Sequence, residues 1–179
     1  MSDASITTDR LLLRLWNPDD RAPFADLNSD PEVMQHFEAP LTREESDRFA
    51  NYIEERLSDI GYGLGAAERL DTNEFIGFIG LAPVSFTAHF TPAVEVGWRL
   101  ARPHWGLGYA SEGGAAAVEF GLDRAGLNEI VSLAVPANAR SIAVMERIGM
   151  THDPIDDFDH PRVAEGHRLR RHVLYRIGG

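Results

Sequence analysis

Cysteine is absent from this chain of 179 residues. That absence excludes disulfide bonds, thiolate nucleophiles, and zinc or iron–sulfur sites built on cysteine. Internal repeats, low-complexity tracts and flexible linkers are missing as well, so we expect a single domain over residues 1–179. A chain of this length is long enough to bury a real hydrophobic core.

Long apolar runs are also missing. No stretch approaches the length of a membrane span, and the N-terminal segment carries Asp3 and Asp9 in place of the apolar centre of a secretory signal. These features predict a cytoplasmic protein without a membrane partner.

Positive charge is scarce. The sequence has 17 Lys and Arg against 28 Asp and Glu, which gives a net charge of −11 at pH 7. This balance disfavours nucleic acid or an anionic membrane as the main partner. It leaves open a ligand that carries phosphate, because backbone N–H groups at a helix N-terminus bind anions without side-chain charge.

Apolar periodicity and turn residues predict a succession of strands and helices. The expected strands are 10–16, 62–70, 74–84, 93–100, 128–136 and 170–177, and the expected helices are 17–28, 29–37, 42–60, 109–124 and 138–148. The helix over 42–60 has the strongest signals, because Thr42 and Glu45 form a capping box and Gly61 is a natural stop.

This order of elements predicts an α/β fold, with one mixed sheet and helices on both of its faces. The unit over 93–136 has the length of a β-α-β crossover, so we expect its two strands to be parallel. A ligand is then expected at the carboxyl ends of these strands, where the segment "ARPHWGLGYA" begins.

That segment places Gly106 and Gly108 directly before a helix. The N–H groups from about Trp105 to Ala110 would then face one concavity at the positive end of the helix, where a pyrophosphate can sit without a lysine. Two glycines before a helix are equally typical of an ordinary turn. A Walker loop is excluded because Tyr109 and Ala110 follow the second glycine, and a Rossmann fingerprint is disfavoured because position 111 is Ser.

Several segments taken together resemble a known family. "EVGWRL", "WGLGYASE" and "NARSIAVMERIGM" are similar to the acetyl-CoA-binding half of the GNAT N-acetyltransferases, and "TDRLLLRLWNPDD" resembles the start of their RimJ/RimL-like branch. The resemblance covers about residues 7–152 and part of the last strand. It implies the GNAT fold, in which a central twisted sheet contains a splayed parallel strand pair.

The same resemblance implies the transfer of an acetyl group from acetyl-CoA to a primary amine, on a protein N-terminus or a small molecule. Direct attack in a ternary complex is the expected route, because no cysteine exists to carry the acetyl group. No metal is implied, and a homodimer is a reasonable expectation for a protein of this size.

Two positions depart from the family pattern. Trp105 stands where the pyrophosphate loop usually begins with Arg or Gln, a variation common in the RimJ/RimL-like branch. Met145 stands where many members carry a tyrosine as general acid, which leaves Ser141 as the remaining hydroxyl candidate.

The resemblance and the loop reasoning together give a set of expected cofactor-binding residues. The set comprises Trp98, Arg99, Leu100, Arg102, His104, Trp105, Gly106, Leu107, Gly108, Tyr109, Ala110, Asn138, Ser141 and Met145. The backbone near Trp98–Leu100 is the expected N–H donor to the oxyanion. Arg147 is a further candidate for the 3′-phosphate, or a surface cation at a helix C-terminus.

The expected catalytic residues are Glu95 and Ser141. Glu95 is the candidate base, acting through a water, and its alternative is a solvated or salt-bridged strand glutamate. Ser141 is the candidate acid, and its alternative is a helical serine bonded one turn back. Asn138 either contacts the pantetheine arm or caps its helix, or does both. Trp98 and Trp105 either wall the site or belong to the core.

A polar segment rich in Asp and His precedes the last strand. Its histidine and aspartate spacing matches no established metal-site pattern, so we expect no metal there. The carboxylates of Asp156, Asp157 and Asp159 either attract a cationic amine acceptor or form a solvated acidic loop.

Two other functions remain open at this point. A non-enzymatic acyl-CoA sensor would keep the phosphate-binding loop and lack transfer, and the missing tyrosine favours it. A nucleotide-binding α/β protein is disfavoured, because the loop lacks a Lys-Ser/Thr pair and a third glycine.

Overall fold

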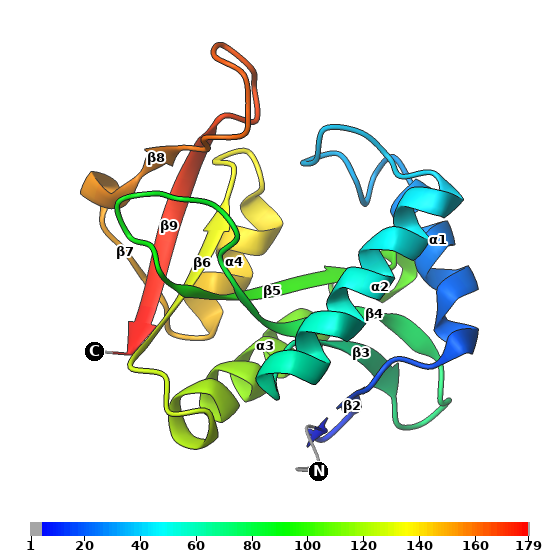
Figure 1. Cartoon of the computed structure of the whole chain (residues 1–179). Helices are drawn as coiled ribbons and strands as arrows, with labels where there is room; N and C mark the ends of the chain where they lie inside the picture. The colour runs from blue at the N-terminus through cyan, green and yellow to red at the C-terminus, as the bar shows by residue number, and fades with distance from the viewer. Residues whose placement is uncertain (1–4, 179) are drawn as a thin grey trace.

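The computed structural model describes residues 5–178. A single mixed sheet runs in the order β1-β2-β3-β4-β5-β6-β9-β7, and β8 pairs with β9 (Figure 1). The strands are β1 (Ile6–Thr7), β2 (Leu11–Arg14), β3 (Leu64–Arg69), β4 (Phe75–Pro83), β5 (Val94–Leu100), β6 (Glu129–Ala134), β7 (Thr151–His152), β8 (Phe158–Asp159) and β9 (Arg171–Gly178).

Helices cover both faces of this sheet (Figure 1). On one face lie α1 (Arg21–Ser29) and α2 (Arg43–Ile60), and on the other lie α3 (Tyr109–Glu119) and α4 (Ala139–Arg147). The strands β5 and β6 are parallel, and the remaining pairs are antiparallel. The mixed α/β fold expected from the sequence is therefore confirmed, including its one parallel pair.

The predicted boundaries of α2 are confirmed in detail. The Thr42 side chain accepts from the Glu45 N–H, the Glu45 carboxylate accepts from the Thr42 N–H at 2.8 Å, and Gly61 ends the helix with φ of 80°. Ile53 is buried against the sheet, whereas Ile60 at the helix end stays 36% exposed. The apolar face of α2 therefore packs against the sheet in the middle of the helix, while the last turn is partly exposed to solvent.

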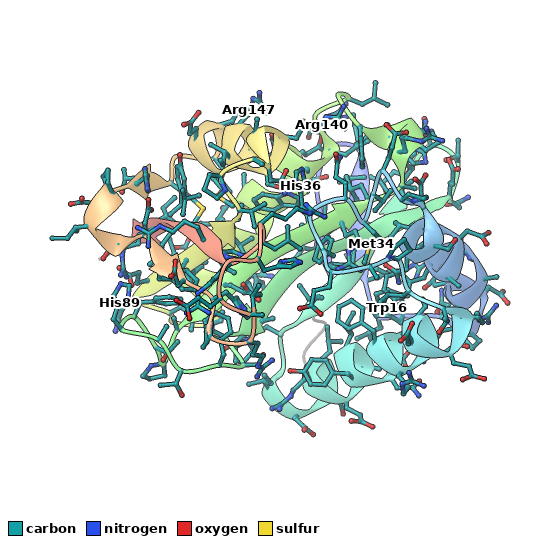
Figure 2. All side chains as sticks on the ribbon, turned by 90° about the horizontal axis from the view of Figure 1, so that it is seen from above. Trp16, Met34, His36, His89, Arg140 and Arg147 are labelled. Atoms are coloured by element: carbon teal, nitrogen blue, oxygen red, sulfur yellow. The ribbon has the colours of Figure 1, made fainter. Side chains whose placement is uncertain are left out.

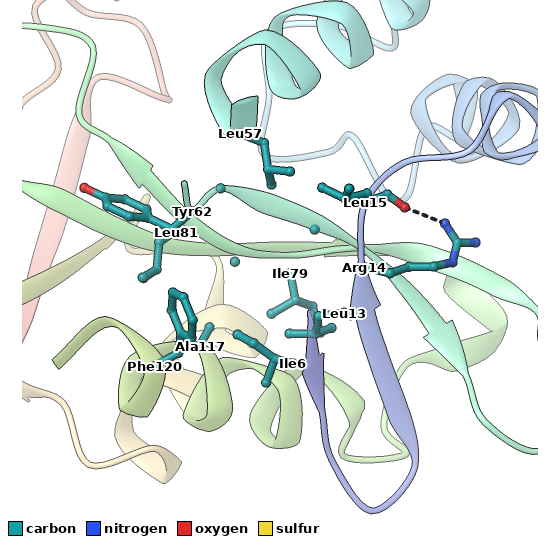
Figure 3. A pocket seen from close by; sticks show the side chains of 13 residues that line it. Ile6, Leu13, Arg14, Leu15, Leu57, Tyr62, Ile79, Leu81, Ala117 and Phe120 are labelled. Atoms are coloured by element: carbon teal, nitrogen blue, oxygen red, sulfur yellow. Dashed lines mark hydrogen bonds between the residues drawn. The ribbon is translucent and has the colours of Figure 1, made fainter. Parts of the chain in front are cut away.

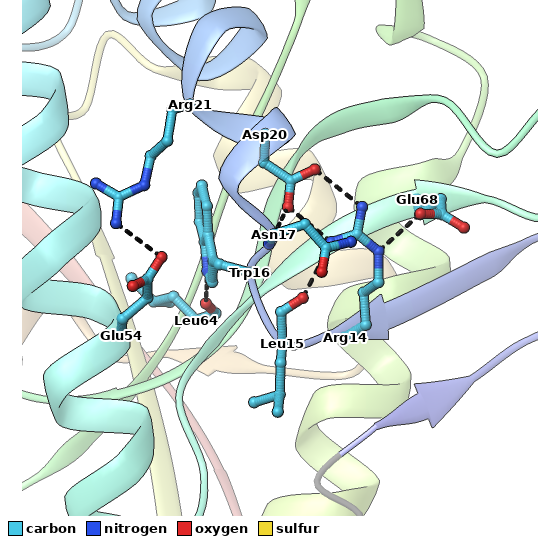
Figure 4. Close-up of polar contacts among 9 residues, drawn as sticks. All are labelled: Arg14, Leu15, Trp16, Asn17, Asp20, Arg21, Glu54, Leu64 and Glu68. Atoms are coloured by element: carbon cyan, nitrogen blue, oxygen red, sulfur yellow. Dashed lines mark hydrogen bonds and ion pairs between the residues drawn. The ribbon is translucent and has the colours of Figure 1, made fainter.

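A buried polar network turns the chain from β2 into α1 (Figure 4). The Arg14 guanidinium pairs with Asp20 at 2.7 Å and with Glu68 of β3 at 2.7 Å, and the Trp16 indole N–H donates to the Leu64 carbonyl at 2.8 Å. Because Asp20 is only 3% exposed, its charge needs this arginine. The network fixes the turn into α1 against β2 and β3.

Several expectations for the elements are wrong. Residues 31–36 form turns in place of the helix expected over 29–37. The segment holds a single i→i+4 bond, from the Met34 N–H to the Asp30 carbonyl, which is too little to propagate a helix. The short strands β1, β7 and β8 carried no recognisable alternation, and the helix expected to run to Arg124 changes into a π-helical turn at Phe120.

Side chains pack on both faces of the sheet (Figure 2). On the face of α3 and α4, Val96 and Met145 share one cluster, and on the face of α1 and α2, Phe24 and Phe78 share another. The strand β5 lies between these two cores, so its two faces meet different surroundings. Within residues 5–178, no helix has the length and apolar character needed to cross a membrane.

Candidate functional site

The parallel strands β5 and β6 separate soon after they meet. Their ladder contains one bridge, between Glu95 and Val131, although β5 continues to Leu100 and β6 to Ala134. One residue beyond this bridge on each strand, the Ser132 hydroxyl donates to the Val96 carbonyl at 3.0 Å. Figure 1 shows the two strands running apart beyond this point. This is the splayed pair that the sequence predicted.

The backbone of β5 presents its polar groups to this separation at alternate residues. The Val96 carbonyl faces β6, because it accepts from Ser132, whereas the Ala101 N–H faces the other way and donates to Ile76 of β4 at 2.9 Å. Polar groups of successive strand residues point to opposite edges, so the N–H and C=O of Trp98 also point toward β6. Trp98 therefore offers a backbone donor between the separated strands.

The loop before α3 has the geometry of an anion site. Gly106 and Gly108 have φ of 73° and 87°, and Gly108 caps α3 without any side-chain hydrogen bond. Within residues 5–178, the N–H groups of Leu107 to Ser111 have no hydrogen-bond acceptor. Free N–H groups at the positive end of a helix fit the pyrophosphate of a coenzyme A molecule. The two predicted glycines have the positive φ that such a loop uses, and the binding of a pyrophosphate there stays a prediction.

Arg10, which directly precedes β2, contacts the loop before α3. Its Nη1 donates to the Leu107 carbonyl at 3.0 Å, and its guanidinium lies 4.7 Å from the centre of the Tyr109 ring. Glu112 of α3 holds the same guanidinium at 2.6 Å and also accepts from Thr8. A charged clamp from the start of the chain therefore fixes the loop that the sequence singled out.

The first turn of α4 closes the other side of the separated strands. The Asn138 side chain accepts from the Ser141 N–H at 3.2 Å, so Asn138 caps the helix as expected. Within residues 5–178 the Ser141 hydroxyl has no hydrogen-bond partner, and the bond to the preceding turn is absent. The hydroxyl is thus free to bind a ligand.

Two arginines extend from α4 toward the loop (Figure 2). The Arg140 guanidinium lies 4.5 Å from the centre of the Trp105 ring, and Arg147 donates to the Ser111 hydroxyl at 2.9 Å. Neither has a carboxylate partner among residues 5–178. Both charges are therefore available to phosphate groups at the start of α3.

Glu95 lies at the point where β5 and β6 part. Its neighbours across the sheet are Ala82 of β4 and Val131 of β6, both apolar. Burial raises the pKa of Glu95 from 4.5 to about 7, and no charged group offsets this effect. A carboxyl group whose pKa lies near neutrality can accept a proton at physiological pH. The salt-bridged alternative does not apply to the described residues, because Glu95 has no such partner there.

Other expected site residues have contacts within the fold. Trp98 packs its ring 3.5 Å from where a side chain on Gly114 would begin, and Met145 is 1% exposed in the core. His104 is buried beside Tyr109, with Glu74 at 3.5 Å. The Trp105 indole donates to the Leu100 carbonyl at 2.7 Å.

Arg102 and Arg99 also have contacts on the side of α1. Arg102 forms ion pairs with Asp30 and Glu32, and Arg99 points to the face of the sheet that α1 and α2 cover. The roles of these residues in binding a cofactor stay predictions. Within residues 5–178, Arg140 and Arg147 differ from Arg102 in having no carboxylate partner.

The three aspartates singled out in the acidic and histidine-rich segment all have partners in the fold. Asp156 pairs with Arg176 at 2.7 Å, Asp157 with His152 at 2.7 Å, and Asp159 with Arg170 at 3.2 Å. His172 stacks against Phe158 and His160 lies tilted against it, and burial lowers the pKa of both imidazoles. Over residues 5–178 no three His, Asp or Glu side chains are grouped so as to hold a metal ion.

A separate apolar hollow lies near the β2 edge (Figure 3). Ile6, Leu57 and Phe120 are among its lining residues, and its one charged member, Arg14, is already paired with Asp20 and Glu68. This hollow holds no free acid or base. The chemistry of the molecule is therefore concentrated where β5 and β6 separate.

A parallel strand pair that opens beside an uncapped helix, with a carboxyl group of raised pKa at the opening, fits the class of acetyltransferases expected from the sequence. Comparison with known families agrees, because the acetyltransferase (GNAT) domain matches residues 10–151. The chain belongs to the GNAT acetyltransferase family.

Individual relatives are consistent with this assignment. The chain is 32% identical to the uncharacterized protein YkkB of Bacillus subtilis (strain 168) over 146 residues, 81% of this chain and 84% of the relative. It is 34% identical over 135 residues to the FsC-acetyl coenzyme A-N(2)-transacetylase of Aspergillus fumigatus, 70% of this chain and 56% of that longer protein. The crystal structure of a GNAT-family acetyltransferase from Bacillus anthracis superposes with a TM-score of 0.79 at 26% identity, covering 97% of this chain and 98% of that one.

Two residues of the site were missed by the sequence reasoning. Arg10 meets the loop from 97 positions away in the chain, and nothing local announces that contact. Arg140 stood in the quoted segment "NARS" without a role. The sequence does indicate that Arg140 has no ion-pair partner along the helix, because positions 136, 137, 143 and 144 carry no acidic residue.

Proposed function

We propose that this protein transfers an acetyl group from acetyl-CoA to a primary amine, by direct attack of the amine within a ternary complex. The observation that carries the proposal is the separation of β5 and β6 beside the free N–H groups of Leu107 to Ser111. The thioester supplies the activated acetyl group. The coenzyme A named for the Aspergillus relative supports this choice of donor.

The chain has polar groups for each end of such a donor. The loop N–H groups, with Arg147 and Arg140, would hold the phosphates, and the Asn138 amide nitrogen is left free to meet the pantetheine arm while its oxygen caps α4. The Arg10 clamp keeps the loop in the shape that these contacts need. Membership of the RimJ/RimL-like branch is part of the proposal and rests on the quoted motifs.

Three groups of this chain would act on the reacting atoms. Glu95 takes a proton from the amine, directly or through a water, because its pKa of about 7 suits a base at neutral pH. The Trp98 N–H faces the oxygen that becomes negative during attack. The Ser141 hydroxyl gives a proton to the departing sulfur, for which a weak acid suffices because a thiol has a pKa of about 8.5.

The balance of this reaction is simple. The amine nitrogen bonds to the acetyl carbon, the carbon–sulfur bond breaks, and the electron pair of that bond leaves with the sulfur. One proton passes from the nitrogen to Glu95, and Ser141 passes one to the sulfur. Exchange with solvent then takes the proton from Glu95 and returns one to Ser141, so both side chains recover their starting states. The products are an N-acetyl amide and free coenzyme A, and no acyl-enzyme is needed because the chain has no cysteine.

Thiol release from acetyl-CoA, followed with a panel of amines and peptides, tests the proposal. The sequence contains no lysine, so acetylation of the enzyme's own lysines cannot contribute to the signal. We expect release that depends on an added amine and an acetylated product of matching mass. Tight coenzyme A binding without turnover for any amine would indicate a non-enzymatic acyl-CoA sensor, and absence of both would remove the proposal.

A further inference from the structure

Arg99 of β5 is a half-buried cation that lacks an anionic partner within residues 5–178. Its Nη1 donates to the Asn28 side-chain oxygen at 2.6 Å, and its Nε is buried without any hydrogen bond. Within residues 5–178 no carboxylate pairs with this guanidinium. Arg14, the other arginine held deep in the fold, has two carboxylate partners. An unpaired buried charge is costly, so this one calls for an explanation.

Aromatic rings offset part of this cost. The guanidinium carbon lies 4.2 Å from the centre of the Phe37 ring, and the rings of Phe49 and Phe78 lie at 5.4 and 5.5 Å. Burial lowers the pKa of Arg99 to about 10, so the group is still cationic at neutral pH. The rings stabilise its charge and leave the hydrogen-bond donors of Nε and Nη2 unused.

The strand places Arg99 on the same face as the proposed base. Side chains alternate along β5, so Glu95, Gly97 and Arg99 point toward α1 and α2, whereas Trp98 packs toward α3. A side chain added at Gly97 would meet only Leu64 Cδ2, at 4.0 Å, so there is space above the strand between the two charged residues. Their Cα atoms are about 13 Å apart along an extended strand.

The nearby surface adds positive charge. Arg168 donates to the Gln35 carbonyl at 3.1 Å, and this arginine and Arg140 both contribute to lowering the pKa of His36, after burial. Figure 2 places His36 and Arg140 on the same side of the molecule. The carboxylates of Asp156 and Asp159 are paired with arginines, and Asp157 is hydrogen-bonded to His152. Arg168 and Arg140 therefore bring positive charge to His36, the residue next to Phe37 in the surroundings of Arg99.

We infer that the amine acceptor also carries a carboxylate, and that Arg99 binds this group while the amine lies at Glu95. The inference rests on the proposed function and names its acceptor class. A planar guanidinium suits a carboxylate, since two parallel N–H donors match two oxygens. Asn28, which is fully buried and donates to the Ser46 hydroxyl at 2.9 Å, keeps the guanidinium in place without neutralising it.

Steady-state kinetics with matched acceptors test this inference. The probes are ω-amino acids of increasing chain length, each compared with its own carboxamide, in the presence of saturating acetyl-CoA. For the wild-type enzyme we expect kcat/KM to be at least about tenfold higher for the acid than for the amide at the best chain length, in line with a charge-assisted hydrogen bond. The preference should lie mainly in KM.

Two substitutions make the test specific. In Arg99→Gln the ratio of kcat/KM for each acid to kcat/KM for its amide should fall to about one, because the glutamine amide cannot form a charge-assisted pair with the carboxylate. In Asn28→Asp the new carboxylate would pair with Arg99 and should remove the same preference. Thermal unfolding of both variants, compared with wild type, shows that they are folded.

The outcomes separate the inference from the proposed function. Thiol release with amines in general, without a preference for acids in the wild type, would overturn the inference and leave the proposed function intact. A preference that persists in Arg99→Gln would also overturn it, and Arg99 would then be a structural cation between aromatic rings. Absence of thiol release with every acceptor would instead count against the proposed function.

Discussion

Glu95 and Arg99 project from the same face of β5, with only Gly97 between them on that face. The opposite face of the strand packs on α3, and its free edge separates from β6 at Glu95. One strand therefore serves two purposes. Its edge offers backbone groups to a donor placed between β5 and β6, and its open face offers a base and a cation to an acceptor.

Glu95 is expected to control the rate of transfer. In Glu95→Gln, kcat should fall on the order of 100-fold or more, because the amide cannot accept the amine proton. In the wild type, kcat/KM should rise with pH through an apparent pKa of about 7, which reports ionisation of this carboxyl group. Initial rates between pH 5.5 and 9 measure both effects.

Glu119→Gln is the matched control for this prediction, because Glu119 is an exposed carboxylate at the end of α3. It should keep the wild-type rate and pH profile. A Glu95→Gln enzyme with normal kcat would show that water alone removes the proton.

The raised pKa of Glu95 also predicts a pH-dependent stability. The pKa is about 7 in the folded protein and 4.5 in the unfolded chain, so the folded state holds this proton more tightly. Its stabilising effect is complete below pH 4.5 and is lost as the pH rises through 7. Between pH 5 and 8, the free energy of unfolding of wild type should fall relative to Glu95→Gln, by at most about 3 kcal/mol. Urea unfolding of both proteins at a series of pH values measures this difference, and parallel curves would rule it out.

The glycine loop is expected to bind coenzyme A through its backbone. Gly106→Ala should raise the Kd for coenzyme A by about tenfold or more, because alanine disfavours φ of 73° and displaces the N–H groups. Gly126→Ala is a close control, since Gly126 also has positive φ, at 69°, with no neighbour near its Cβ position, and lies after α3. Both variants should lose similar stability, and calorimetry should show weaker binding in the first alone.

Arg147 is expected to meet a phosphate of the cofactor. Arg147→Gln should weaken coenzyme A by about tenfold, and should weaken 3′-dephospho-coenzyme A much less if the contact is to the 3′-phosphate. Arg124→Gln, at an exposed arginine beyond α3, serves as the control and should bind both ligands normally. Equal losses for the two ligands would place Arg147 at the pyrophosphate instead.

The sequence predicted the parts of the fold that local signals determine. Thr42, Glu45 and Gly61 defined α2, and the spacing from Ala93 to Pro136 predicted the parallel pair. The turns at 31–36 were missed because Val33 and Met34 are fixed by burial in the core, a long-range effect. Short strands such as β7 and β8 exist only because β9 lies beside them.

For the site, the sequence identified the loop and Glu95 but not their surroundings. The clamp from Arg10 and the absence of a partner for Arg99 both depend on contacts between distant segments. The spacing of residues along the sequence does not predict such contacts. The acidic run at 156–159 shows the converse, since its aspartates look unpaired in the sequence but contact Arg176, His152 and Arg170 in the structure.

A crystal structure with coenzyme A bound tests the central claim most directly. We predict that the pyrophosphate lies on the N–H groups of Leu107 to Ser111 and that the pantetheine arm passes between β5 and β6. The sulfur should then lie near Trp98 and Ser141, with Glu95 within one water molecule of it. Coenzyme A bound elsewhere, or a sulfur beyond the reach of Glu95, would contradict the account.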